Sequence, residues 1–305
     1  MMQLDPNISI SNDLFQRLDR RVDSAPVLKY YSFGARICQE IHSNWLTVLA
    51  CIILFIIVVA CLLAPLSPYD PNAINISDKF LGPSAEHWFG TDAYGRDYFT
   101  RALYGGRVSL SVGFCSMLVT IVMGTAIGVL AGYLGGKIDL ILMRFTDIFL
   151  ALPSMLLMIV LNTMLQPNMT TLILVLSLFS WASVARITRA ETMAVKERDF
   201  VAASYNLGAP RLLIAVKHIF PNIIGPVIVA ASLSVADAIL TESSLSFLGL
   251  GISIPNASWG SMLQSAQAQI LDHPMMAIYP GAFILLTVLS FNLLGDSIRS
   301  ALEPK

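Results

Sequence analysis

Long runs of residues without a single charge leave few folds open to this chain. Residues 45–66 contain no charged side chain, and neither do residues 108–136. An α-helix needs about 20 apolar residues to cross the hydrocarbon core of a membrane, which is roughly 30 Å thick. Because no water is available there to hydrogen-bond the backbone, such runs form helices rather than open sheets. The sequence therefore predicts an all-α polytopic membrane protein.

The composition argues against a soluble globular protein. Only 13% of the 305 residues are charged, whereas soluble domains contain about 25%. The formal net charge of −1 provides no basic surface for nucleic acid. The four cysteines form no CxxC pair, and the four histidines form no HxxxH or HExxH pattern. We therefore expect neither a nucleic-acid partner nor a metal site.

The uncharged stretch at residues 148–185 is too long for one ordinary membrane span. The triplet at residues 166–168, Gln-Pro-Asn, divides it and brings the expected number of spans to six. Residues 243–271 are also uncharged, but they are rich in Ser, Gly, Gln and Asn, so we expect an external loop or a partly re-entrant segment there. The transmembrane domain then covers residues 45–305, behind a polar segment at residues 1–44. Its expected spans lie at about residues 45–66, 108–132, 143–165, 169–187, 217–240 and 275–297.

Lysine and arginine are distributed unevenly between the expected loops. If the N-terminus is cytoplasmic, the cytoplasmic segments hold 15 of the 19 Lys and Arg residues. An excess of basic residues in the cytoplasmic loops sets the orientation of most helical membrane proteins. We therefore expect a multi-pass protein of the inner (cytoplasmic) membrane with both termini in the cytoplasm. In this arrangement residues 1–44 act as a cytoplasmic tether.

Three glycines in the expected second span, Gly124, Gly128 and Gly132, form two overlapping GxxxG motifs. Small residues at this spacing allow two helices to approach closely in lipid, so we expect these glycines to pack against another helix. The pattern leaves two alternatives open, a contact within the subunit and a contact between subunits.

Charged residues within the expected spans are few. Arg144 and Asp147 lie three residues apart near the cytoplasmic end of the third span, where they can pair. Asp237 and Glu242 lie near the expected outer end of the fifth span. A secondary carrier or a proton pump more often places a carboxylate near the middle of the membrane. This distribution therefore does not favour a secondary carrier.

A glycine-rich turn at residues 132–139 contains a Gly-Lys pair, yet it is not a phosphate loop. In the pattern GxxxxGK[ST], Ala131 stands where the first glycine belongs and Ile138 stands where Ser or Thr belongs. No Ser/His/Asp or Cys/His set stands out either. We therefore expect no cofactor and no enzymatic activity in this chain.

A short segment with polar flanks interrupts the apolar runs at residues 198–222. Its first ten residues have the periodicity of a short amphipathic helix. Gly208 follows, where a left-handed residue ends a helix, and Pro210 prevents the helix from resuming. A second helix is expected to begin near Arg211, with a kink at Pro221 on entry to the fifth span. The apolar face of the first helix consists of Phe200, Ala203 or Ser204, and Leu207.

On amphipathicity alone, a solvated connecting helix is the favoured interpretation of this segment. It also resembles the cytoplasmic coupling motif, named for Glu-Ala-Ala, of permeases in ATP-binding-cassette importers. In that pattern a glycine follows four residues after the last Ala, and a later segment ends in His-Ile-x-Pro. Ala202, Ala203 and Ser204 occupy the triplet, Gly208 is the glycine, and residues 218–221 form the end. Ala202 replaces the usual Glu, which removes any salt bridge of that Glu but leaves the helix-turn-helix shape.

Four further segments resemble the second permease subunit of dipeptide, oligopeptide and nickel importers. Together with the coupling motif they stand in the order typical of that family, and the resemblance covers nearly the whole chain from Trp45. The segments are HWFGTDAYGRDYFTRALYGGRVSL from His87, GYLGGKIDLILMRFTDIFLALP from Gly132, ESSLSFLGLGISIPNASWGSML from Glu242 and FNLLGDSIRSALEP from Phe291.

The resemblance implies a six-helix permease subunit that imports di- or oligopeptides. Two partner ATPase subunits would bind ATP and Mg²⁺, a second homologous permease would complete the pathway, and an external binding protein would deliver the substrate. A nickel or metallophore importer is the alternative within the family, and a secondary carrier or membrane-embedded enzyme is the alternative from another class. Residues 70–107 and 243–271 would dock the binding protein or pack against the second permease. The implied ATPase-coupling residues are Phe200, Ala202, Ala203, Ser204, Leu207, Gly208, His218 and Pro221.

Overall fold

The structure is a computed structural model that describes residues 33–166, 168–252 and 255–302. Within these ranges the chain is helical and has no β-strand beyond one isolated bridge between Thr91 and Asp97. Most of the tether expected at residues 1–44 lies outside the described residues. The helices are α1 (Phe33–Ser43), α2 (Trp45–Leu62), α3 (Tyr98–Leu134), α4 (Gly136–Ala151), α5 (Ser154–Leu165), α6 (Met169–Lys196), α7 (Asp199–Asn206), α8 (Arg211–Ile214), α9 (Phe220–Phe247), α10 (Trp259–Gln267) and α11 (Met275–Leu302).

Five helical segments are long and apolar enough to cross a membrane, and α4 with α5 makes a sixth if that bent pair is one span. The expected span at residues 143–165 is broken in the structure, because α4 and α5 meet at an angle of 81°. Leu152 between them is extended, with φ −79° and ψ 141°. Pro153 causes this break, since a proline lacks the amide hydrogen and disfavours a helical conformation in the residue before it.

The structure also gives the helix ends at two other expected boundaries. The break at residues 166–168 is confirmed, because the Asn168 side chain accepts from the Thr171 amide and caps α6. The helix of the expected fifth span, at residues 217–240, extends further, because α9 continues to Phe247. Asp237 therefore lies ten residues before the end of α9, roughly 15 Å along the helix axis. This corrects the expectation that Asp237 lies near the outer end of its span.

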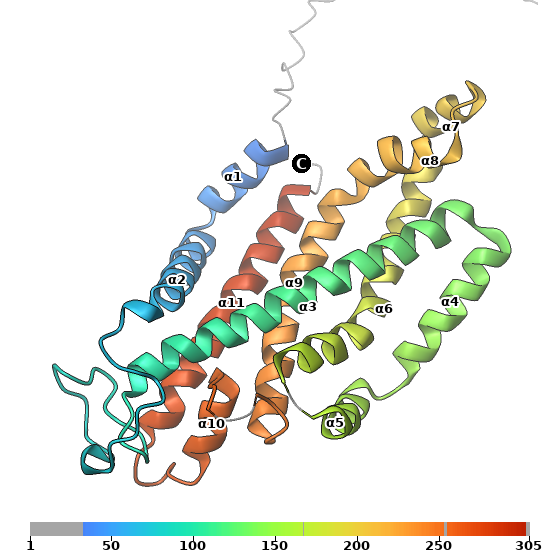
Figure 1. The fold of residues 1–305 in the computed structure, drawn as a ribbon. Coiled ribbons are helices and arrows are strands. Elements are labelled where there is room, and N and C mark those ends of the chain that lie inside the picture. Colours follow the sequence, from blue (N-terminus) through green and yellow to red (C-terminus); the bar gives the residue numbers. More distant parts are fainter. Residues whose placement is uncertain (1–32, 167, 253–254, 303–305) are drawn as a thin grey trace, which may run out of the picture.

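The long helix α3 runs through the centre of the fold, with its most extensive contact on α6 (Figure 1). Gly124, Gly128 and Gly132 all lie at this contact. A Cβ atom built on Gly128 would stand 2.5 Å from the Ala185 carbonyl oxygen, and one on Gly132 would stand 2.8 Å from the Arg189 carbonyl oxygen. The glycines therefore bring α3 against α6 of the same chain, which is the intrasubunit alternative.

The segment at residues 243–271 is part helix and part loop. It contains the end of α9 and the short helix α10, which is packed against α3, α9 and α11. Trp259 in α10 is fully buried and donates from Nε1 to the Ala102 carbonyl oxygen at 2.9 Å. Glu242 in α9 is also buried and accepts hydrogen bonds from Ser109 of α3 at 2.9 Å and from Ser246 at 2.6 Å. These bonds satisfy a buried carboxylate and join three helices.

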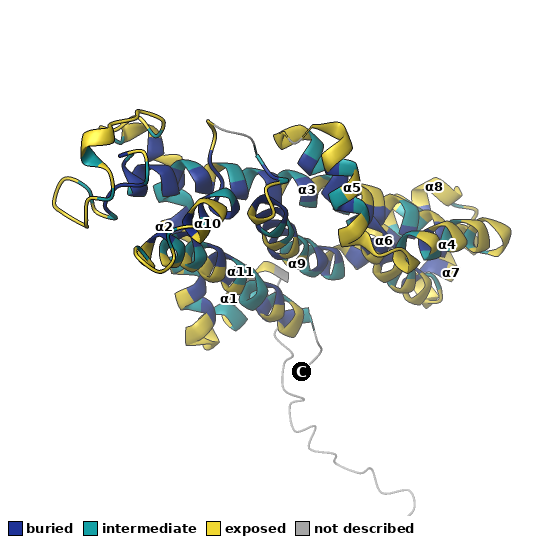
Figure 2. Cartoon of the chain, turned by 90° about the horizontal axis from the view of Figure 1, so that it is seen from below, coloured by how far each residue is buried: buried dark blue, intermediate teal, exposed yellow. Residues whose placement is uncertain are grey.

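Many large apolar side chains lie on the outside of the helices. In α2, Phe55 is 68% exposed and Ile56 is 58% exposed, although α2 has no charged residue. Helices α4, α5, α7 and α8 are also largely exposed (Figure 2). Water disfavours such a surface, whereas lipid or a partner subunit would cover it.

Candidate coupling site

The expected short helix at residues 198–207 is α7, which runs over Asp199–Asn206. Its end is fixed by two backbone hydrogen bonds, from Gly208 to the Tyr205 carbonyl and from Ala209 to the Ser204 carbonyl. This pair of bonds is the Schellman arrangement, in which the residue after the helix is left-handed. Gly208 has a φ of 83°. A glycine is favoured at this position because it has no Cβ to oppose that conformation.

Helix α7 packs against its own subunit through Val201. The predicted apolar face, which includes Phe200 and Leu207, does not make this contact. Val201 is 4% exposed and packs in one cluster with Val195 at the end of α6, Ile214 in α8 and Ile219 before α9. Burying such a side chain contributes roughly 1.5–3 kcal/mol. Val201 therefore fixes α7 to the ends of two membrane-spanning segments.

The predicted apolar face of α7 points away from this cluster. Phe200 is 39% exposed and Leu207 is 88% exposed, and Ala203 is also exposed. Leu212 of α8 continues the exposed apolar surface at 76%. Figure 1 shows that α7 and α8 project at one end of the molecule, opposite the end that carries α10. An exposed apolar face on a short projecting helix is suited to docking into a groove on another protein.

Three of the predicted residues, Phe200, Ser204 and His218, lie together. The Ser204 hydroxyl is 3.4 Å from Nε2 of His218 and donates to the Phe200 carbonyl oxygen at 2.9 Å. The rings of Phe200 and His218 are 6.4 Å apart between centroids. His218 belongs to a π-helical turn at Ala215–Ile219, which leads into α9. Pro221 stands in the first turn of α9, and its missing amide hydrogen accounts for this irregular turn before it.

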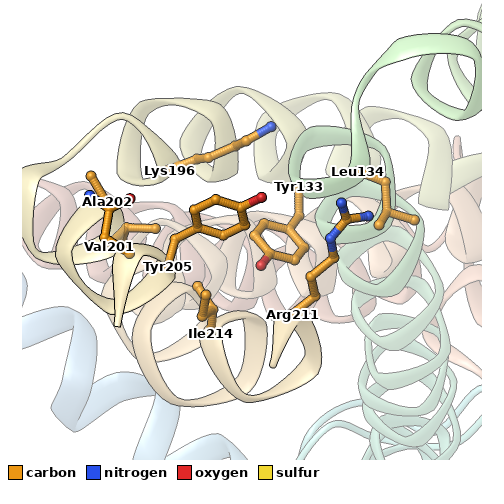
Figure 3. Close-up of a pocket in the computed structure, with 9 residues that line it drawn as sticks. Tyr133, Leu134, Lys196, Val201, Ala202, Tyr205, Arg211 and Ile214 are labelled. Carbon is orange, nitrogen blue, oxygen red and sulfur yellow. The ribbon is translucent and has the colours of Figure 1, made fainter. Parts of the chain in front are cut away.

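A hollow of about 350 Å³ lies beside α7 (Figure 3). Ala202 lines it together with Tyr205 of the same helix, Tyr133 at the end of α3, and the basic side chains of Lys196 and Arg211. A glutamate at position 202 would therefore lie in the same hollow as two cations. The sequence pattern did not single out Lys196, Arg211 or the two tyrosines, because the turn at Gly208 and the end of α3 bring them together.

The site offers surfaces for docking rather than groups for catalysis. Among the residues that the structure describes, no group of three or more His, Cys, Asp or Glu side chains is arranged to hold a metal ion. Gly124, Gly128 and Gly132 lie outside the site, at the contact between α3 and α6. What the site presents is a short exposed helix that is fixed to two longer ones.

These features define a polytopic helical permease subunit, and comparison with known proteins gives the family. Residues 124–305 match the family described as binding-protein-dependent transport system inner membrane component. Residues 32–83 match the N-terminal transmembrane domain of oligopeptide transport permease C. The chain belongs to the binding-protein-dependent transport system inner membrane components. The family predicted from the sequence is thereby confirmed, and the chain is a permease component of the membrane rather than an enzyme.

Similar proteins cover nearly the full length of the chain. The dipeptide transport system permease protein DppC of Bacillus subtilis (strain 168) is 40% identical over 296 residues, which are 96% of this chain and 92% of that protein. The oligopeptide transport system permease protein OppC of Haemophilus influenzae is 41% identical over 270 residues, or 88% of this chain and 87% of that protein. The nickel transport system permease protein NikC of Escherichia coli (strain K12) is 35% identical over 265 residues, which are 87% of this chain and 96% of that protein.

Proposed function

We propose that this chain is one of two permease subunits in an ATP-driven importer of di- or oligopeptides. Two separate ATPase subunits would bind and hydrolyse ATP, a homologous permease would form the other half of the pathway, and an external binding protein would deliver the peptide. The observation that carries this proposal is the exposed face of α7, anchored through Val201 and followed by the left-handed Gly208. The similarity to dipeptide and oligopeptide permeases supports peptide as the cargo.

The packing of α7 suggests how movement of an ATPase would reach the membrane. Val201 contacts the cluster that contains Val195 of α6 and Ile223 and Val227 of α9. A displacement of α7 would therefore pull on the ends of both helices together. Since α6 and α9 are themselves in contact, they would tilt as a unit and open the pathway to one side of the membrane or the other.

Nickel or a metallophore complex is the alternative cargo, because a nickel permease is among the similar proteins. The higher identity to the dipeptide and oligopeptide permeases favours peptide. A bare metal ion also needs several ligands, and the described residues contain no cluster of three candidate ligands. Peptide therefore remains the cargo that we propose.

The function is tested by reconstituting the chain with its partner permease, ATPases and binding protein in vesicles. We expect peptide uptake that requires ATP and all the partners, with ATP hydrolysis stimulated by the peptide-loaded binding protein. The purified chain alone should hydrolyse no ATP, because its Gly-Lys pair lacks the first glycine and the Ser/Thr of a phosphate loop. Hydrolysis by the single chain, or uptake driven by an ion gradient without ATPases, would contradict the proposal.

The proposed orientation places α7 in the cytoplasm and residues 63–97 outside. We expect Ala73→Cys to react with an impermeant thiol reagent in intact cells, and Glu197→Cys to react only after permeabilisation. Both positions are exposed in the structure, so a lack of reaction from one side reports the membrane and not burial. Cys38, Cys51, Cys61 and Cys115 are replaced beforehand to remove background labelling. Labelling of both cysteines from the same side would refute this orientation.

A further inference from the structure

A second hollow, of about 310 Å³, lies between the α4–α5 elbow, α6 and α9. Apolar side chains and polar groups line it in nearly equal measure, and its hydroxyl groups come from α5, α6 and α9. Asp237 of α9 is the one charged residue among those that line it. The hydroxyl-bearing side chains are Ser154, Ser180, Ser183, Thr241 and Ser244.

Asp237 has no partner in the described parts of the chain. No ion pair or hydrogen bond involves its carboxylate, and the residue is exposed to the hollow. The acidic residues next along the same helices have partners, since Asp147 of α4 pairs with Arg186 at 2.5 Å and Glu242 of α9 is bonded by serines. An ionisable side chain within a membrane-spanning helix is costly without a partner. A cation supplied by another molecule would therefore stabilise the carboxylate of Asp237.

The break between α4 and α5 brings the C-terminus of α4 and the N-terminus of α5 to the same hollow, so the partial charges of the two helix ends oppose each other. The last four carbonyl groups of a helix have no donor within it, so a helix carries partial negative charge at its C-terminus. Leu150 in the last turn of α4 and Leu152 after it both line the hollow. The hydroxyl oxygens of Ser183 and Thr241 can accept further hydrogen bonds. The hollow thus presents one carboxylate and several hydrogen-bond acceptors.

We propose that this hollow binds the positively charged amino group of the transported peptide, with Asp237 as the counter-ion. The proposal rests on peptide transport by the complex. A primary ammonium fits the hollow because it has three N–H donors. At least one can donate to the carboxylate, and the others can donate to hydroxyl oxygens. A single carboxylate among hydroxyl groups gives a divalent metal too few ligands by comparison. Asp237 would thus hold the peptide weakly on its way through this half of the pathway.

The test compares Asp237→Asn and Asp237→Glu in the complete reconstituted complex. Uptake of trialanine, whose amino terminus is its only cation, is measured together with ATP hydrolysis. We expect Asp237→Asn to lower trialanine uptake at least fivefold, and Asp237→Glu to retain at least half of it. Stimulation of ATP hydrolysis by the loaded binding protein should stay unchanged, because α7 is untouched. The matched control is Asp296→Asn in α11, which removes a carboxylate outside the hollow and should leave uptake unchanged.

Several outcomes separate the possible errors. If the wild-type complex takes up no peptide, both the proposed cargo and this inference are overturned. If the wild type and Asp237→Asn take up peptide equally, the inference alone is overturned. Equal losses in Asn and Glu variants would show a need for shape rather than charge. Reduced co-purification of Asp237→Asn with the second permease would show that Asp237 pairs with that subunit instead.

An effect on Ala-Lys-Ala but not on trialanine would assign the hollow to lysine side chains, and an effect on both would assign it to the amino terminus.

Discussion

Replacing Gly208 by valine is expected to abolish the stimulation of ATP hydrolysis by the peptide-loaded binding protein, and peptide uptake with it. Gly208 has a φ of 83°, and a Cβ built on it would have no other atom within 4 Å. The loss would therefore come from the backbone and not from a clash. A left-handed conformation costs an ordinary L-residue roughly 1–2 kcal/mol, and a β-branched residue more. Valine would break the Schellman turn and change the direction of α8 relative to α7.

The matched control for this variant is Gly208→Asn. Asparagine also adds a side chain at the same open position, but it tolerates the left-handed region far better than valine does. We expect Gly208→Asn to keep most of the stimulation, and both variants to insert into the membrane, because the spans are unchanged. Normal stimulation in Gly208→Val would mean that α7 is only a connector. Equal loss in both variants would mean that the partner needs a bare backbone here and not a left-handed turn.

The ends of α7 were predictable from the sequence because their cause is local. Gly208 and Pro210 end the helix through the conformations that these two residue types favour. The covered face of α7 was not predictable in the same way. Phe200 and Val201 are both apolar neighbours in a helix of two turns, and only the positions of α6 and α8 decide that Val201 is buried.

The membrane spans illustrate the same limit at a larger scale. Apolarity alone predicted where helices occur, but it could not show that Pro153 bends the third span by 81°. The end of α9 looked too polar for a helix because it contains several serines. In the structure Ser243 and Ser246 donate to Glu242 and Ser244 donates to the Leu240 carbonyl oxygen, so their polarity is satisfied inside the protein. Asp237 consequently lies further from the end of its helix than the sequence indicated.

The last prediction concerns the contact between α3 and α6, which holds the core of the subunit together. We expect Gly128→Ala to destabilise the purified subunit by about 1–3 kcal/mol, the usual cost of overpacking. The added Cβ would stand 2.5 Å from the Ala185 carbonyl oxygen and 2.9 Å from the Arg189 amide nitrogen. Because both atoms belong to the backbone, a rotamer change cannot relieve the contact, and α6 must move as a whole.

The control is Gly281→Ala in α11, where the nearest atom to the new Cβ would be 3.9 Å away on Leu263. Both substitutions gain helix propensity, worth about 0.8–1 kcal/mol for alanine over glycine. Gly281→Ala should therefore match or exceed the wild-type midpoint of thermal unfolding in detergent, while Gly128→Ala should fall several degrees below it. Since α6 ends at the Val195 cluster that anchors α7, a displaced α6 should also weaken stimulation of ATP hydrolysis by the loaded binding protein. Equal midpoints for the two alanine variants would show that α3 and α6 are not in close contact at Gly128.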